Sequence, residues 1–222
     1  MALSDFINGG TTPATATINK NEVIGAEDNA VNVAFASIIA NINADGGLAG
    51  WRDNIIPFGQ AGKGAAAPAQ VTDSNGFERF SFGVGDEVFT DFHVNHDYAL
   101  GTVAYPHVHW MPTTTMTVGQ TVVWQFSYVV AKGHQQGQTL LAAPTVITMT
   151  HTADGTELAG EHMITEVLIG SAFQLIEPDT VISARIRRIT GTYPSAIYGL
   201  MADLHYQANY FSTKNRAPDF YV

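Results

Sequence analysis

The chain has 222 residues, which is enough for one large hydrophobic core, and only 14% of them are charged, against a usual share of about 25%. Twenty acidic and ten basic residues give a formal net charge of −10, which excludes DNA or RNA as the main ligand because affinity for a phosphate backbone depends on positive charge. The absence of cysteine excludes disulfides and thiolate metal sites, and it is typical of a protein made in a reducing cytoplasm.

The low charge content predicts a largely neutral surface of Thr, Asn, Gln, Gly and Ala, which suits a protein whose faces lie against other subunits. No stretch approaches the roughly eighteen apolar residues of a membrane span. The first ten residues do not combine a basic region with an apolar run. We therefore expect neither a membrane partner nor a signal peptide.

Residues 1–26 are rich in Thr, Ala, Asn and Gly and predict an extended N-terminal arm. Phe6 and Ile7 are apolar exceptions that could anchor the arm to a neighbouring subunit. A stripe of apolar residues at helical spacing then predicts one short helix over roughly residues 29–43, with a pair of β-strands as the alternative. The stripe consists of Val31, Phe35, Ile38, Ile39 and Ile42.

Residues 46–70 divide into an apolar first part and a second part, Q-A-G-K-G-A-A-A-P-A-Q, whose composition predicts a linker. The first part is too apolar for a free loop, so we expect it to pack under the main domain or against a second chain. Its candidate inter-subunit residues are Trp51, Ile55, Ile56 and Phe58. The predicted organisation is an arm, helix and linker over residues 1–70 and a β-domain over residues 71–222.

Beyond residue 70 the pattern is β almost throughout. Apolar and polar residues alternate in Trp124-Gln125-Phe126-Ser127-Tyr128, and turn-forming residues separate the runs. The predicted strands span residues 77–83, 88–96, 104–111, 121–131, 144–150, 161–169, 180–189 and 197–209. Strands without intervening helices predict an all-β fold, an antiparallel jelly-roll-like β-sandwich.

His107 and His109 are two residues apart, so on a strand both imidazoles leave the same face. With His205 beside Asp203 they could form a cupin-like metal site inside a barrel, but no carboxylate follows His109 at the offset such sites use. We favour a structural interpretation, in which the imidazoles bond to backbone, Asp or Arg. If strands 180–189 and 197–209 are neighbours, Arg–Asp and His–Asp pairs would satisfy both strand faces. The prediction is no metal and no cofactor, with His107, His109 and His205 as weak candidate ligands.

His93 and His96 are three apart, and on a regular strand they would point to opposite faces and could not chelate an ion together. No G-x-S-x-G motif and no phosphate-binding loop is present. Glu157, Glu161 and Glu166 are best interpreted as solvated acids rather than glycosidase carboxylates. We therefore predict no catalytic residues and no enzyme.

Six motifs in a fixed order carry a resemblance to a known group of proteins. They are D-F-H-V-N-H-D-Y, Y-P-H-V-H-W-M-P, V-V-W-Q-F-S-Y, E-H-M-I-T-E, D-L-H-Y and S-T-K-N-R-A-P-D-F. Over roughly residues 50–220 the chain resembles virion-associated proteins of tailed bacteriophages. The resemblance implies a structural component of a phage particle and assigns no catalytic residue.

Within that class the resemblance implies a capsid decoration (cement) protein, made in the host cytoplasm and bound to the outer surface of the head. Such proteins are often jelly rolls that form homotrimers, and the implied partners are the major capsid protein and other copies of the chain. One alternative is a tail fibre or adaptor protein involved in host attachment, with residues 132–140 at the exposed tip. A second alternative is a cupin-like metalloprotein.

Overall fold

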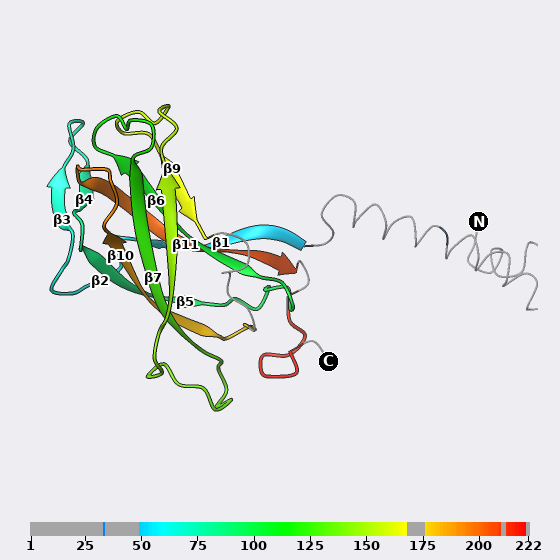
Figure 1. Cartoon of the computed structure of the whole chain (residues 1–222). Helices are drawn as coiled ribbons and strands as arrows, with labels where there is room; N and C mark the ends of the chain where they lie inside the picture. The colour runs from blue at the N-terminus through cyan, green and yellow to red at the C-terminus, as the bar shows by residue number, and fades with distance from the viewer. Residues whose placement is uncertain (1–32, 34–48, 168–175, 210–211, 221–222) are drawn as a thin grey trace, which may run out of the picture. The chain divides into compact units, whose positions relative to one another are not determined.

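Two antiparallel sheets packed face to face form the described part of the molecule (Figure 1). The computed structural model describes residue 33 and residues 49–167, 176–209 and 212–220. The chain divides into two units, residues 1–48 and 49–222. In the described part of the second unit the strands are β1 (Ala49–Pro57), β2 (Gly62–Lys63), β3 (Ala69–Thr72), β4 (Glu78–Phe82), β5 (Glu87–His93), β6 (Ala104–Pro112), β7 (Thr121–Ala131), β8 (Thr145–Thr152), β9 (Met163–Glu166), β10 (Val181–Ile189) and β11 (Ile197–Asn209).

The strand order is that of a jelly roll. One sheet, here called sheet A, has the order β3-β4-β11-β6-β9, with β1 also paired to β11, and sheet B has the order β2-β5-β10-β7-β8. If the strands from β4 to β11 are counted as one to eight, sheet A holds the first, eighth, third and sixth, and sheet B holds the second, seventh, fourth and fifth. This arrangement of two interleaved Greek keys confirms the predicted fold class and the eight predicted strands.

Alternation along each strand places one set of side chains between the sheets. In β10 the buried positions are Ile182, Ala184, Ile186 and Arg188. Aromatic rings from the two sheets meet in this core. The ring of Phe82 in sheet A lies edge-on to Trp124 in sheet B, with 5.3 Å between ring centroids.

Arg188 is a charged residue on the core face, and only 2% of it is exposed. Its Nη1 donates to the carbonyl of Phe82 at 2.7 Å, and its Nη2 donates to the carbonyl of Tyr193 at 3.1 Å. Burial lowers the pKa of Arg188 because the charged form loses its hydration. Through these two hydrogen bonds, Arg188 links the end of β4 to the loop after β10.

The segment from Ala49 to Thr72 differs from the prediction. β1 adds to sheet A beside the second half of β11, from Ala49 opposite Asn209 to Pro57 opposite Met201. β2 pairs with β5 and β3 pairs with β4, so the predicted linker belongs to the sandwich. The boundary expected at residue 70 is therefore wrong for these strands, because the free edges of β11, β5 and β4 recruit residues whose composition resembles a linker.

The predicted arm lies outside the described residues, as do Phe6 and Ile7. Of the predicted helix 29–43, the structure describes Val33, which is helical. No helix among the described residues is both long enough and apolar enough to cross a membrane.

Candidate functional site

The outer face of sheet A, directed away from the core, carries a row of histidines and acids. Val108 and Trp110 of β6 point into the core, so His107 and His109 point out on the opposite face, as their spacing predicts. His107 is opposite Asp203 of β11 in the strand register. The imidazoles therefore lie on the outer face of sheet A and not inside a barrel as the cupin-like hypothesis expects, although donor atoms of His107, His109 and Asp203 do lie within 4.8 Å of one another.

Asp203 organises one half of this row. Only 2% of Asp203 is exposed, and its Oδ2 lies 3.0 Å from His109 Nε2 while its Oδ1 contacts His107 Nε2. His109 Nδ1 is in turn 2.7 Å from His162 Nε2. Burial raises the pKa of Asp203, but hydrogen bonds and charge from the two imidazoles outweigh burial and hold this pKa below its ordinary value. Asp203 is therefore a buried carboxylate that fixes both rings of β6.

The other half of the row is built around His205 of β11. Its Nδ1 lies 3.7 Å from Glu166 Oε2 and 4.0 Å from Asp53 Oδ1. The same Glu166 oxygen is 3.5 Å from His107 Nδ1. The ring of Trp51 packs edge-on against His205, with 4.7 Å between centroids. Four strands, β1, β6, β9 and β11, thus supply polar atoms to one place.

The three candidate ligands share this face, but they do not form one site. His107 and His205 face Glu166, whereas both nitrogens of His109 are engaged by Asp203 and His162. Arg–Asp pairing with strand 180–189 does not occur in the described part of the chain, because β10 and β11 belong to different sheets, but Asp203 pairs with imidazoles as the structural interpretation expects. Sequence reasoning also missed the contributions of β1 and β9, since the register that aligns them with β11 and β6 has no local signal.

The structure places the candidate interface residues in different environments. Trp51 and Ile55 are about half exposed on the outer face of sheet A, and Ile164 of β9 is similarly exposed on the same face. Ile56 is half-buried and packs against the core. Phe58 is 1% exposed and contacts Phe82, so its prediction as an inter-subunit contact is wrong.

A second polar cluster lies at Asp179, in the turn before β10. Its Oδ1 is 3.3 Å from His93 Nε2 and 3.1 Å from His96 Nε2, and its Oδ2 is 2.6 Å from His134 Nε2. His93 and His96 both reach Asp179 because β5 ends at His93 and the regular strand does not continue to His96, while the statement that the two do not chelate an ion together stays a prediction. Burial raises the pKa of Asp179, but these imidazoles hold it below its ordinary value. The cluster attaches the loop between β7 and β8 to the sandwich.

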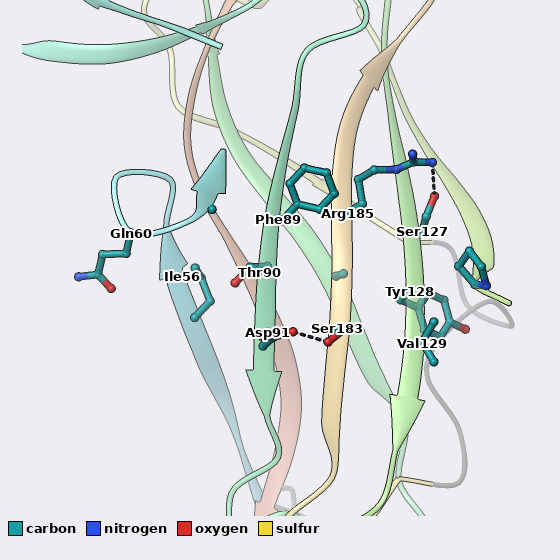
Figure 2. Close-up of a pocket in the computed structure, with 13 residues that line it drawn as sticks. Ile56, Gln60, Phe89, Thr90, Asp91, Ser127, Tyr128, Val129, Ser183 and Arg185 are labelled. Atoms are coloured by element: carbon teal, nitrogen blue, oxygen red, sulfur yellow. Dashed lines mark hydrogen bonds between the residues drawn. The ribbon is translucent and has the colours of Figure 1, made fainter. Parts of the chain in front are cut away.

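A groove of about 790 Å³ crosses the outer face of sheet B. Figure 2 shows Phe89, Asp91, Ser183 and Arg185 along it, with dashed hydrogen bonds from Ser183 to Asp91 and from Arg185 to Ser127. One exposed aromatic ring among hydroxyl, carboxylate and guanidinium groups can contact a polar ligand through both stacking and hydrogen bonds.

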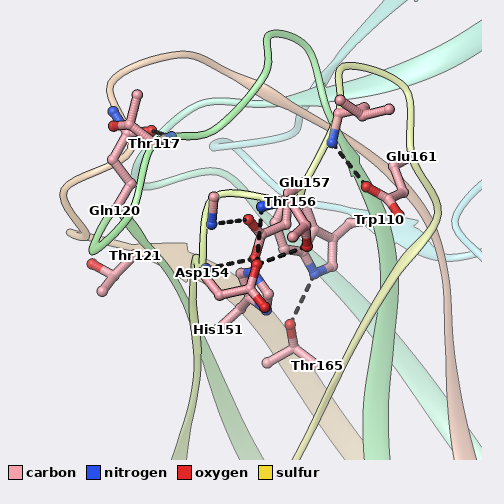
Figure 3. Close-up of polar contacts among 12 residues, drawn as sticks. Trp110, Thr117, Gln120, Thr121, His151, Asp154, Thr156, Glu157, Glu161 and Thr165 are labelled. Atoms are coloured by element: carbon pink, nitrogen blue, oxygen red, sulfur yellow. Dashed lines mark hydrogen bonds and ion pairs between the residues drawn. The ribbon is translucent and has the colours of Figure 1, made fainter.

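Glu157 is buried in the loop between β8 and β9 (Figure 3). Its Oε1 accepts hydrogen bonds from the Asp154 N–H at 3.0 Å and from His151 Nε2 at 2.9 Å, and its Oε2 accepts one from the Gly155 N–H at 3.0 Å. The interpretation of Glu157 as a solvated acid is wrong, because the turn N–H groups surround it. Its function is structural.

No family model matches this chain. No curated protein matches it either. Among solved structures, a Cry1Da tryptic core variant of Bacillus thuringiensis is similar over 69% of this chain and 23% of that chain, with 12% identity and a TM-score of 0.42. The CBM22-1–GH10 modules of Clostridium thermocellum xylanase 10B match over 75% and 28%, with 12% identity and a TM-score of 0.34. The chain thus spans less than a third of either structure, and these similarities assign no function.

Proposed function

We propose that the protein is a structural component of a bacteriophage particle, which binds the outside of the capsid as a homotrimer and stabilises it at contacts between capsomers. Its partners in this proposal are the major capsid protein and other copies of the chain. The resemblance of its motifs to those of phage virion proteins and the jelly-roll fold support the proposal. The observation that carries it is the row of exposed apolar side chains on the outer face of sheet A.

These side chains lie on both edges of one surface. Ile55 on β1 is opposite Asp203, and Ile164 on β9 is opposite His109, so the two isoleucines flank the row of histidines and acids. Trp51 extends the apolar edge along β1. About half of each of these three side chains is exposed. Exposed apolar side chains gathered on one strand surface are suited to contact with another subunit.

The free energy that these three side chains can contribute on burial limits their share of the proposed interface. Complete burial of a large apolar side chain contributes about 1.5–3 kcal/mol, so three half-exposed side chains contribute roughly 2–4 kcal/mol together. A stable interface of about 1,200–2,000 Å² requires many more contacts than these. Trp51, Ile55 and Ile164 therefore supply only part of the proposed interface, and other parts of the chain must complete it.

The copy number of the protein in purified virions tests the location. A band ratio to the major capsid protein between about one to one and one to a few supports a decoration protein, because symmetric shells repeat their components. A ratio of about one to a hundred contradicts head decoration and indicates a tail component. Absence of the protein from virions contradicts both.

A double variant, Ile55→Ser with Ile164→Ser, tests the surface. We expect the trimer or its binding to undecorated capsids to weaken at least tenfold, measured by light scattering and sedimentation with capsids. Val146→Ser is the matched control, because Val146 is an equally exposed β-branched residue on a strand of sheet B. Wild-type assembly of the double variant would contradict the proposed interface.

The groove on sheet B favours a second candidate function, attachment to a host glycan by a tail fibre or adaptor protein. Phe89 is an exposed ring beside the polar side chains of Asp91, Ser183 and Arg185, which is the combination that sugar rings and hydroxyls require. We expect Phe89→Ala to reduce binding to host cells by roughly five- to tenfold, while Phe77→Ala, an exposed ring outside the groove, leaves it unchanged. Equal binding by both variants would exclude the groove.

A further inference from the structure

Four side chains from four strands bring metal-binding atoms together on the outer face of sheet A. Asp53, His107 and His205 each have one donor atom within 4.8 Å of the other two. Glu166 Oε2 lies 3.5 Å from Nδ1 of His107 and 3.7 Å from Nδ1 of His205. No pair of these residues is close in sequence, so the strand register alone assembles the group.

His107 gives the strongest sign of a ligand. Its side chain is 5% exposed, and its Nδ1 is buried without a hydrogen-bond partner among the described residues. A buried polar atom without a partner is costly, and native structures satisfy almost all such atoms. The atom lies 3.5 Å from the oxygen of Glu166 without forming a hydrogen bond, and this separation suits two ligands of one ion.

Asp203 holds His107 as a metal-binding imidazole is usually held. A histidine that binds a metal commonly donates its other ring N–H to a carboxylate, which fixes its tautomer and orientation. Asp203 Oδ1 contacts Nε2 of His107. This contact does not have hydrogen-bond geometry, but it places a carboxylate oxygen beside Nε2; with the proton on Nε2, Nδ1 presents its lone pair to the place between Glu166 and His205.

The distances fit a four-coordinate ion. Zinc bonds of about 2.0–2.2 Å in tetrahedral geometry place ligand atoms roughly 3.3–3.6 Å apart. The separations of 3.5 and 3.7 Å around Glu166 and of 4.0 Å between His205 and Asp53 are close to this range. Glu166 is not within 4.8 Å of all three other donor atoms, but Asp53 and Glu166 are both partly exposed, so their carboxylates can rotate toward the two imidazoles when an ion binds.

We propose that Asp53, His107, Glu166 and His205 bind one Zn²⁺ ion on the outer face of sheet A. Two imidazoles with two carboxylates are a ligand set suited to zinc, whereas Mg²⁺ and Ca²⁺ prefer oxygen ligands. Four protein ligands leave no open position for a reaction, so the ion is structural. It holds β1 and β9 to the central strands β11 and β6.

Zinc content measures the proposal directly. The full chain is purified without a histidine tag, stripped with a chelator, incubated with zinc chloride and dialysed. We expect about one zinc per chain by elemental analysis. In the cobalt-substituted chain, we expect the intense visible absorption of a tetrahedral Co²⁺ site. A wild-type chain that retains no stoichiometric zinc would overturn the proposal.

His205→Ala and Glu166→Gln separate ligand loss from misfolding, because both residues are partly exposed. Each is expected to weaken zinc binding by roughly tenfold or more and to remove the cobalt absorption, with an unchanged circular dichroism spectrum. His93→Ala is the matched control, since His93 is an exposed imidazole of sheet B near an aspartate. Zinc affinity unchanged in His205→Ala, or reduced equally in His93→Ala, would refute the assignment.

Discussion

Replacing Glu157 by glutamine tests how much one buried carboxylate contributes to the loop between β8 and β9. The carboxylate is 4% exposed and accepts three hydrogen bonds, from the N–H groups of Asp154 and Gly155 and from His151. Glutamine has nearly the same shape, but its amide nitrogen donates rather than accepts. One of the three donors therefore faces another donor in the variant.

The magnitude follows from the number of bonds lost. A hydrogen bond to a charged group contributes about 1.5–3 kcal/mol, and those that remain weaken when the acceptor is neutral. Because the Asp154 and Gly155 N–H groups can reach water, we expect Glu157→Gln to lower the free energy of unfolding by about 2–3 kcal/mol. The melting temperature should fall by roughly 4–12 °C for a domain of this size.

The pH dependence gives an independent check. Burial raises the pKa of Glu157, but hydrogen bonds from the turn N–H groups and His151 hold it below the ordinary value of 4.5. A carboxyl with a lowered pKa in the folded state contributes stability that is complete above pH 4.5 and disappears as the pH falls through the folded pKa. The difference between wild type and Glu157→Gln should therefore be largest near pH 7 and shrink below pH 4.5.

Urea unfolding followed by circular dichroism at several pH values measures this difference. Glu161→Gln is the matched control, because Glu161 is exposed in the same loop and accepts a hydrogen bond from the Leu158 N–H at 2.8 Å. We expect its effect to stay within about 1 kcal/mol. An equal loss in the two variants, or a loss for Glu157→Gln that does not depend on pH, would refute the role assigned to this carboxylate.

Three further changes test the packing and the loops. Gly199→Ala places a methyl group against two core phenylalanine rings and should lower the free energy of unfolding by about 1–3 kcal/mol, measured by chemical denaturation. An unchanged denaturation midpoint would show that the core can rearrange to accept the methyl group. Tyr193→Phe removes a hydroxyl that accepts a hydrogen bond from the Thr114 N–H at 2.9 Å, and it should lower the free energy of unfolding by about 1 kcal/mol. A melting temperature equal to that of the wild type would contradict this. Asp179→Asn weakens the 2.6 Å contact with His134, so limited proteolysis of the loop after β7 should accelerate, and an unchanged cleavage rate would indicate that other contacts hold the loop.

The strands could be predicted from the sequence because their signal is local. In β7, Trp124 and Phe126 alternate with polar residues, and both are buried in the structure. The same period of two places His107 and His109 on one face of β6. Alternation cannot tell which face meets the other sheet when both faces carry bulky side chains, so the position of the histidines outside the core needed the structure.

β1 was missed because its strand character depends on its partner. The run Arg52-Asp53-Asn54 is polar and follows glycines, which is typical of a loop. This run becomes a strand because β11 is longer than its partner β4. Only the first residues of β11 pair with β4, so β1 can pair with the remaining edge of β11, from Met201 to Asn209. The composition of residues 59–70 likewise predicts a linker, although parts of this segment form β2 and the start of β3.

The sequence by itself therefore determined the β class, most strand positions and the pairing of two histidines on one strand face. Only the tertiary structure decided that Asp53 and Glu166 join His107 and His205, and that Asp203 lies behind them. The physical reason is that side-chain alternation repeats every two residues, whereas a site of this kind depends on which strand edges meet and in which register. Register is set by backbone hydrogen bonds between segments far apart in the sequence, such as Asp53 and His205, which are 152 positions apart, and no local pattern encodes it.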